Sequence, residues 1–111
     1  MTSMKSSNIN KQELAKLVFD DKLKSDVDNT LKNYYGVKTV NYRLLTYGMG
    51  IEISGSNNFN FIHGAVIKVT GLPSETISII SEDEKNGFAF YAYLPEKDKT
   101  INKRIRTQKI L

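Results

Sequence analysis

Residues 37–54, VKTVNYRLLTYGMGIEIS, hold two runs of alternating apolar and polar side chains, separated by a glycine-containing turn. The apolar positions of the two runs are Val40, Tyr42, Leu44, Ile51 and Ile53. A period of two is typical of a strand with one buried face, and a short glycine-rich turn between two such runs indicates an antiparallel hairpin. The segment therefore predicts a β-sheet with one face against a core.

The residues before this hairpin have the spacing of a helix instead. Asn10 and Glu13 stand three positions apart, as in a capping box at a helix start. The apolar residues that follow at helical spacing are Leu14, Leu17, Val18, Leu23, Val27, Leu31 and Tyr35. Phe19 is one position out of register and Asp20-Asp21 follows it, so a kink or a break is expected there. We predict an N-terminal amphipathic helical unit of roughly 25 residues, ended by Gly36.

Three segments after the hairpin have features of strands: Phe59 to Val69, Thr76 to Ile80 and Phe88 to Leu94. In the first of them Phe59, Phe61, Ala65, Ile67 and Val69 share one face at a period of two. Short polar or proline-containing turns separate the segments. The pattern predicts an α+β fold, in which the helix packs on an antiparallel meander of about five strands in a single domain over residues 1–96.

Positive charge is concentrated in the last fifteen residues. This segment, residues 97–111, has one acidic residue, Asp98, and a net charge of +5, and its basic residues are Lys97, Lys99, Lys103, Arg104, Arg106 and Lys109. Residues 1–96 have ten basic and eleven acidic residues, a net charge of −1. A basic C-terminal tail on a near-neutral body is typical of an appendage that meets a polyanion, although a solvated end or an edge strand rich in lysine has the same composition.

The sharpest local motif is Asn86-Gly-Phe-Ala-Phe-Tyr-Ala-Tyr93. It is similar to the aromatic strand motif of RNA recognition motif domains. In that family the rings at the positions of Phe88 and Phe90 lie on the exposed face of the sheet and stack on bases. The resemblance covers about a tenth of the chain, and too few residues follow Tyr93 for that family's second helix and last strand.

Alternation along the same strand gives a different prediction. It places Phe88, Phe90 and Leu94 in the core and Tyr91 and Tyr93 on the wet face. Tyrosine serves base stacking and protein contacts equally well, so Tyr91 and Tyr93 join the basic tail as candidate nucleic-acid or partner-binding residues.

His63 is the only histidine of the chain. We expect a hydrogen-bonded residue at the margin of the core; a general base that acts with Arg43 or Lys68 is the alternative. Glu82, Asp83 and Glu84 lack the ligand pattern of a calcium loop and are expected in a solvated turn. With no cysteine, thiolate chemistry and cysteine-based metal sites are excluded, and we expect no metal or cofactor.

These features favour a small non-enzymatic binding module that contacts nucleic acid through its basic tail. The alternative is an inhibitor or adaptor, of the type that phages and mobile elements encode, that binds a partner protein; a small ribonuclease toxin is a third interpretation. No apolar run approaches the length of a membrane span, so we expect a cytoplasmic protein without membrane attachment.

Overall fold

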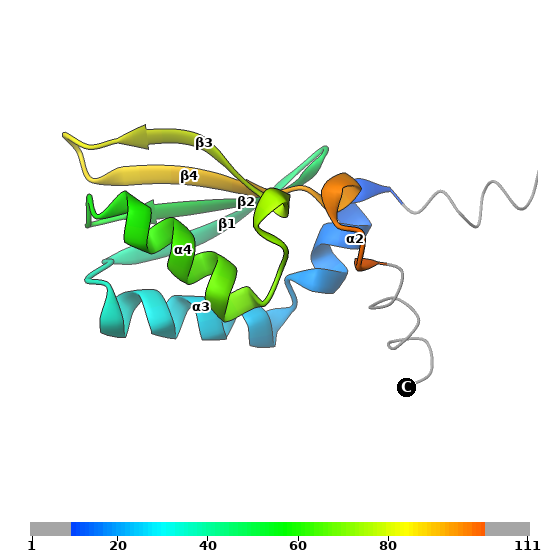
Figure 1. Cartoon of the computed structure of the whole chain (residues 1–111), viewed down its shortest axis with the longest axis horizontal. Coiled ribbons are helices and arrows are strands. Elements are labelled where there is room, and N and C mark those ends of the chain that lie inside the picture. Colours follow the sequence, from blue (N-terminus) through cyan, green and yellow to red (C-terminus); the bar gives the residue numbers. More distant parts are fainter. Residues whose placement is uncertain (1–9, 102–111) are drawn as a thin grey trace, which may run out of the picture.

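The computed structural model describes residues 10–101, which form a two-layer α+β fold (Figure 1). The helices are α2 (Lys11–Val18), α3 (Asp21–Tyr34) and α4 (Phe59–Thr70), with short 3-10 turns η1 (Ser74–Thr76) and η2 (Pro95–Lys97). The strands are β1 (Thr39–Leu45), β2 (Gly48–Ser54), β3 (Ile77–Asp83) and β4 (Phe88–Tyr93). Helices α3 and α4 lie side by side under one face of the sheet, and α2 lies at one end of it.

The predicted break in the N-terminal helical unit is present between α2 and α3. The Asn10 side chain accepts a hydrogen bond from the Glu13 amide, 2.9 Å away, and caps α2. The Asp20 carboxylate accepts one from the Leu23 amide, also at 2.9 Å, and caps α3. Between the two helices Phe19 is 1% exposed and packs against Tyr42 and Tyr93. The residue that was out of register therefore anchors the corner in the core.

The sheet is antiparallel with the strand order β1-β2-β4-β3. The β1–β2 hairpin is confirmed, with Tyr42 opposite Ile51. The predicted meander is wrong, because the chain leaves β2 through α4, forms β3 at the far edge and returns as β4 between β2 and β3. This is a split β-α-β arrangement. It makes β4 a central strand and leaves β1 and β3 as the edges among the described residues.

The predicted third strand is a helix, so the sheet has four strands and not five. Ile62, Ala65 and Val66 are buried at helical spacing, whereas Phe61, which alternation placed in the core, is 64% exposed. Apolar residues occupy so many positions in this segment that both periods fit it. Its length of twelve residues and the glycine that follows favour a helix: Gly71 has φ 70° and donates its amide to the Ile67 carbonyl.

The packed body continues past the predicted domain boundary at residue 96. Asp98 is 2% exposed and accepts a hydrogen bond from the Tyr93 hydroxyl, and Ile101 packs against the core. The first residues of the predicted basic tail therefore belong to the fold. Lys103, Arg104, Arg106 and Lys109 lie outside the described residues.

Candidate nucleic-acid interface

Strand β4 turns its tyrosines toward the helices and its phenylalanines toward the opposite face of the sheet. Tyr91 and Tyr93 are both 0% exposed, and the prediction that they lie on the wet face is wrong. Because side chains alternate along a strand, Phe88 and Phe90 lie on the face that α3 and α4 do not cover (Figure 1). Phe88 is 36% exposed. We call this face, formed by the outward side chains of β1 to β4, the open face.

The buried tyrosines have polar partners that hold them in place. The Tyr91 hydroxyl donates to Glu82 Oε2 at 3.1 Å, and its ring lies against His63 with 5.3 Å between the centroids. Burial, and next the nearby negative charge of Glu82, raise the pKa of Tyr91. Neither tyrosine has a ring face available to a base, so both are structural residues here.

Phe90 lies flat across the neighbouring strand. A β-carbon built on Gly50 of β2 would come within 2.7 Å of Cε1 and 2.9 Å of Cζ of the Phe90 ring. Glycine in a strand often marks such a close approach. The ring therefore rests on the bare backbone of β2.

A guanidinium covers the outer side of the same ring. The Arg43 guanidinium carbon is 5.3 Å from the Phe90 ring centroid, within cation–π range. Arg43 Nε is also 3.6 Å from Glu52 Oε2. Arg43 and Phe90 thus form a cation–π pair, and the same guanidinium lies close to the Glu52 carboxylate.

Apart from Leu45 at the end of β1, the remaining side chains that the register places on the open face are small or polar. In the register of the sheet, Phe88 stands between Ser54 and Asp83, and Ala92 stands between Gly50 and Ser78. At the β1 edge the Thr39 and Ser54 hydroxyls are hydrogen-bonded to each other. The open face is therefore flat, with Phe88 and the Arg43–Phe90 pair as its largest features.

The charge of the open face is close to balanced. Arg43 is offset by Glu52, and Asp83 lies at the hairpin end, where hydrogen bonds from the side chain and backbone of Asn86 lower the pKa of its carboxyl group. A balanced platform offers stacking but few cations for phosphates. The cations of residues 97–111 would have to supply them.

Two candidate phosphate-binding residues of the tail lie within the described residues. Lys97 closes η2 and Lys99 follows it, and both are exposed. Lys11 Nζ lies 2.5 Å from Glu96 Oε1, and this contact lowers the pKa of Glu96. Lys97 and Lys99 therefore lie at the end of the molecule where α2 and η2 meet.

His63 occupies the margin of the core, as expected, but from a helix. Its Nε2 atom is 2.9 Å from the Ile77 carbonyl oxygen, so this nitrogen carries the proton and donates. The partners proposed for catalysis are not gathered around it. Arg43 lies on the open face with Phe90, on the other side of the sheet from α4, and Lys68 lies on an exposed face of α4. This geometry gives the toxin interpretation no support.

The acidic cluster is exposed, as the sequence predicted, but two of its three residues lie in a strand and not in the turn. Glu82 and Asp83 end β3, and Glu84 begins the turn to β4. Over residues 10–101, no group of His, Asp and Glu side chains has the arrangement of a metal site. Within the same range no helix has the length and apolar character needed to cross a bilayer.

Sequence reasoning missed Arg43 and Gly50 as parts of the candidate interface. The signal was the glycine pair Gly48 and Gly50 in β2, because glycines in a strand indicate a close neighbour on one face. A comparison with protein-family models, curated proteins and solved structures finds no match to this chain. The candidate interface therefore rests on its own geometry.

Proposed function

We propose that this protein is a small non-enzymatic binding module that contacts single-stranded nucleic acid. The open face would hold unpaired bases, and the basic C-terminal segment would hold phosphates. The observation that carries the proposal is the pair of phenylalanines on the open face, Phe88, which is exposed, and Phe90, which lies beneath the Arg43 guanidinium. A cytoplasmic location remains a prediction of the same proposal.

The spacing of the two rings supports an extended strand as the ligand. Phe88 and Phe90 are two residues apart on one strand, which places them about 7 Å from each other. A flat face that offers the Phe88 ring and, over Phe90, the Arg43 guanidinium fits splayed bases, because bases stack both on aromatic rings and on guanidinium planes. A duplex keeps its bases stacked inside and would not engage these rings.

Binding a single strand requires both the open face and the basic C-terminal segment. Stacking contributes about 1–3 kcal/mol per base, and the near-neutral open face adds little attraction for phosphates. Residues 102–111 contain four basic and no acidic residues. Each phosphate that such cations neutralise adds about 0.7 to the magnitude of the salt slope for a single strand.

The test is a fluorescence-anisotropy titration with labelled single strands of about 12 nucleotides, DNA and RNA, at about 50 and 200 mM salt. The double variant Phe88→Ala, Phe90→Ala should weaken binding at least tenfold without changing the salt slope. Tyr34→Ala is the matched control, because Tyr34 is 79% exposed but lies on the helix side. Replacement of Lys103, Arg104, Arg106 and Lys109 by Gln should flatten the slope. Absence of binding, or equal binding by the double variant, would reject the proposal.

A second candidate function, a protein-directed inhibitor or adaptor, is favoured by the outer edge of β3. No other described strand pairs with this edge, and Ile79 and Ile80 are 50% and 47% exposed beside the register shift of β3. An exposed edge of this kind accepts an extended segment of a partner by strand addition. In this case Ile80→Lys would abolish partner binding, whereas the Phe88→Ala, Phe90→Ala variant would retain it.

A further inference from the structure

Helix α4 exposes a large aromatic side chain on the side that faces away from the sheet. Between Phe59 and Thr70 its only charged residue is Lys68. Ile62, Ala65 and Val66 face the core, yet the outward side carries Phe61, which is 64% exposed. The other exposed residues of α4 are Asn60, Gly64 and Lys68, so Phe61 is the one large apolar side chain that this side exposes. Aromatic side chains are enriched at protein interfaces, so the exposed ring marks this side of α4 as a candidate interface.

A glycine lies at the middle of this outward side. A β-carbon on Gly64 would meet no atom within 4 Å, so packing inside the protein does not explain the absence of a side chain. Glycine is also the least favourable residue inside a helix apart from proline. What a bare helix backbone does allow is the close approach of another chain.

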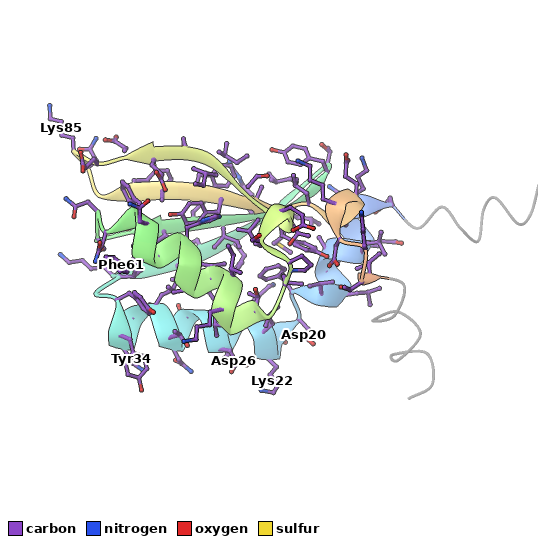
Figure 2. All side chains as sticks on the ribbon, viewed as in Figure 1. Asp20, Lys22, Asp26, Tyr34, Phe61 and Lys85 are labelled. Atoms are coloured by element: carbon purple, nitrogen blue, oxygen red, sulfur yellow. The ribbon has the colours of Figure 1, made fainter. Side chains whose placement is uncertain are left out.

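A groove lies between α4 and α3. It has a volume of about 470 Å³ and is lined by Thr30, Tyr34, Tyr35, Ala65, Lys68 and Val69. Tyr34 is 79% exposed at its rim and lies at the same end of the helix layer as Phe61 (Figure 2). Along α4 the order is thus a protruding ring, a bare backbone and an apolar groove.

We propose that a second copy of this chain covers this surface, with the two α4 helices antiparallel and crossed at Gly64. A two-fold axis at residue 64 brings each residue before it opposite a residue equally far after it. Phe61 of each copy then meets residues 67–68 of the other and enters its groove. Phe61 precedes the axis and the α4 residues that line the groove, Ala65, Lys68 and Val69, follow it, so the ring of each copy stands opposite the α4 side of the other copy's groove.

The charges agree with this pairing. Lys68 is four residues from the axis, so the two copies of this lysine stand about 12 Å apart along the helices, beyond the Debye length of about 8 Å at physiological salt. Each ammonium group would lie near the Phe61 ring of the partner subunit, an attractive cation–π arrangement.

The area that the proposed dimer would bury indicates how stable the dimer should be. The exposed parts of Phe61 and Tyr34 in two copies amount to about 600 Å² of mostly apolar surface. The groove walls bring the buried total near the roughly 1,000 Å² at which specific interfaces begin. We therefore expect a weak dimer, because weak and transient complexes lie at this low end of the range of interface areas. This inference is independent of the proposed function, since it uses the opposite layer of the fold.

Sedimentation equilibrium of the full chain from about 5 to 500 µM tests the association. The unmodified protein should pass from monomer to dimer in this range, and Phe61→Glu should weaken dimerisation at least tenfold. Phe88→Glu, an aromatic-to-acid change on the open face, is the matched control and should leave the dimer intact. Far-UV circular dichroism verifies that each variant is folded.

The absence of cysteine allows a second, geometric test. Gly64→Cys places one thiol per copy at the axis, so mild oxidation should give a disulfide-linked dimer within the Cα separation of about 4.4–6.8 Å that a disulfide needs. Lys85→Cys, at the tip of the β3–β4 hairpin, is the control and should cross-link much more slowly. A protein that stays monomeric to 500 µM, a Phe61→Glu dimer of unchanged affinity, or equal cross-linking of the two cysteine variants would overturn the proposal.

Discussion

The contact between Gly50 and Phe90 makes a quantitative prediction about Gly50→Ala. In most strands this change is stabilising, because alanine loses less backbone entropy than glycine on folding, by about 0.5–1 kcal/mol. Here the new methyl group would stand 2.7 Å from Phe90 Cε1 and 3.1 Å from the Arg43 carbonyl oxygen. The ring must move off β2, and its contacts with Gly50 and with the Arg43 guanidinium are lost.

We expect Gly50→Ala to lower the free energy of unfolding by about 1–2 kcal/mol, because an extra methylene forced into a packed site typically costs about 1–3 kcal/mol and the entropy gain of alanine offsets part of this cost. In a domain of this size that change lowers Tm by about 4–8 °C. The matched control is Gly64→Ala, studied at low micromolar protein concentration. Its β-carbon meets nothing within 4 Å, so helix propensity should raise the free energy of unfolding by up to about 1 kcal/mol.

A double-mutant cycle in urea isolates the ring from other effects. With Phe90→Ala already present, the methyl group at residue 50 has no ring to displace, so the cost of Gly50→Ala should fall by about 1 kcal/mol or more. The contact with the Arg43 carbonyl is common to both backgrounds and cancels in the comparison. An equal effect of Gly50→Ala in the two backgrounds would show that the ring does not rest on β2, and the argument for the open face would lose its basis.

Three other predictions test the fold and its ionisation. Val66→Ala should lower the free energy of unfolding by about 2 kcal/mol in chemical denaturation, whereas Phe61→Ala at low micromolar protein concentration should lower it by less than about 0.5 kcal/mol. If residues 59–69 formed a strand, Phe61→Ala would be the more destabilising of the two changes. Gly48→Ala should prevent stable folding, judged by circular dichroism, because its β-carbon would overlap the Tyr93 carbonyl oxygen at 2.0 Å. Burial raises the pKa of Tyr91 above its ordinary value of 10.0, so the contribution of Tyr91 to stability is complete below pH 10. Above pH 10 the tyrosine of the unfolded chain ionises first, and the free energy of unfolding should fall by about 1.4 kcal/mol per pH unit. Tyr91→Phe should reduce this alkaline loss of stability in urea titrations, and an unchanged pH profile would contradict the prediction.

The sequence predicted correctly the helices and strands whose apolar residues fit either the period of a helix or the period of a strand, but not both. The β1–β2 hairpin has apolar residues at a strict period of two, and the helical unit before it has apolar residues at steps of three and four with capping residues at Asn10 and Asp20. Residues 59–70 carry apolar side chains at positions that fit both a period of two and a helical period, so pattern alone does not separate helix from strand. The length of this segment and the glycine that follows it were better evidence for a helix. Because the segment was predicted as a strand, the helical crossover between β2 and β3 was predicted as a meander.

The candidate interface was mispredicted for a related physical reason. Alternation along β4 defines two faces, one with residues 88, 90 and 92 and the other with residues 89, 91 and 93. Both faces contain aromatic rings, and on hydrophobicity alone the face with the phenylalanines is expected to be buried. The tyrosines are buried instead because each hydroxyl has a polar partner at the margin of the core, Glu82 for Tyr91 and Asp98 for Tyr93. These partners come from β3 and from beyond η2, and only the tertiary structure brings them together.

The two proposals use opposite layers of the molecule, and together they give a prediction that neither gives alone. A dimer through α4 would leave both open faces outward, so one long strand would engage two sites and bind with avidity set by the linker between them. At protein concentrations near the dimer dissociation constant, a single strand of about 40 nucleotides should therefore bind more tightly than one of about 12 nucleotides by more than the ratio of their lengths. Phe61→Glu should remove this excess without changing the affinity for the short strand, because residue 61 is far from the open face. An excess that survives in Phe61→Glu would mean that neighbouring proteins meet along the strand by another surface.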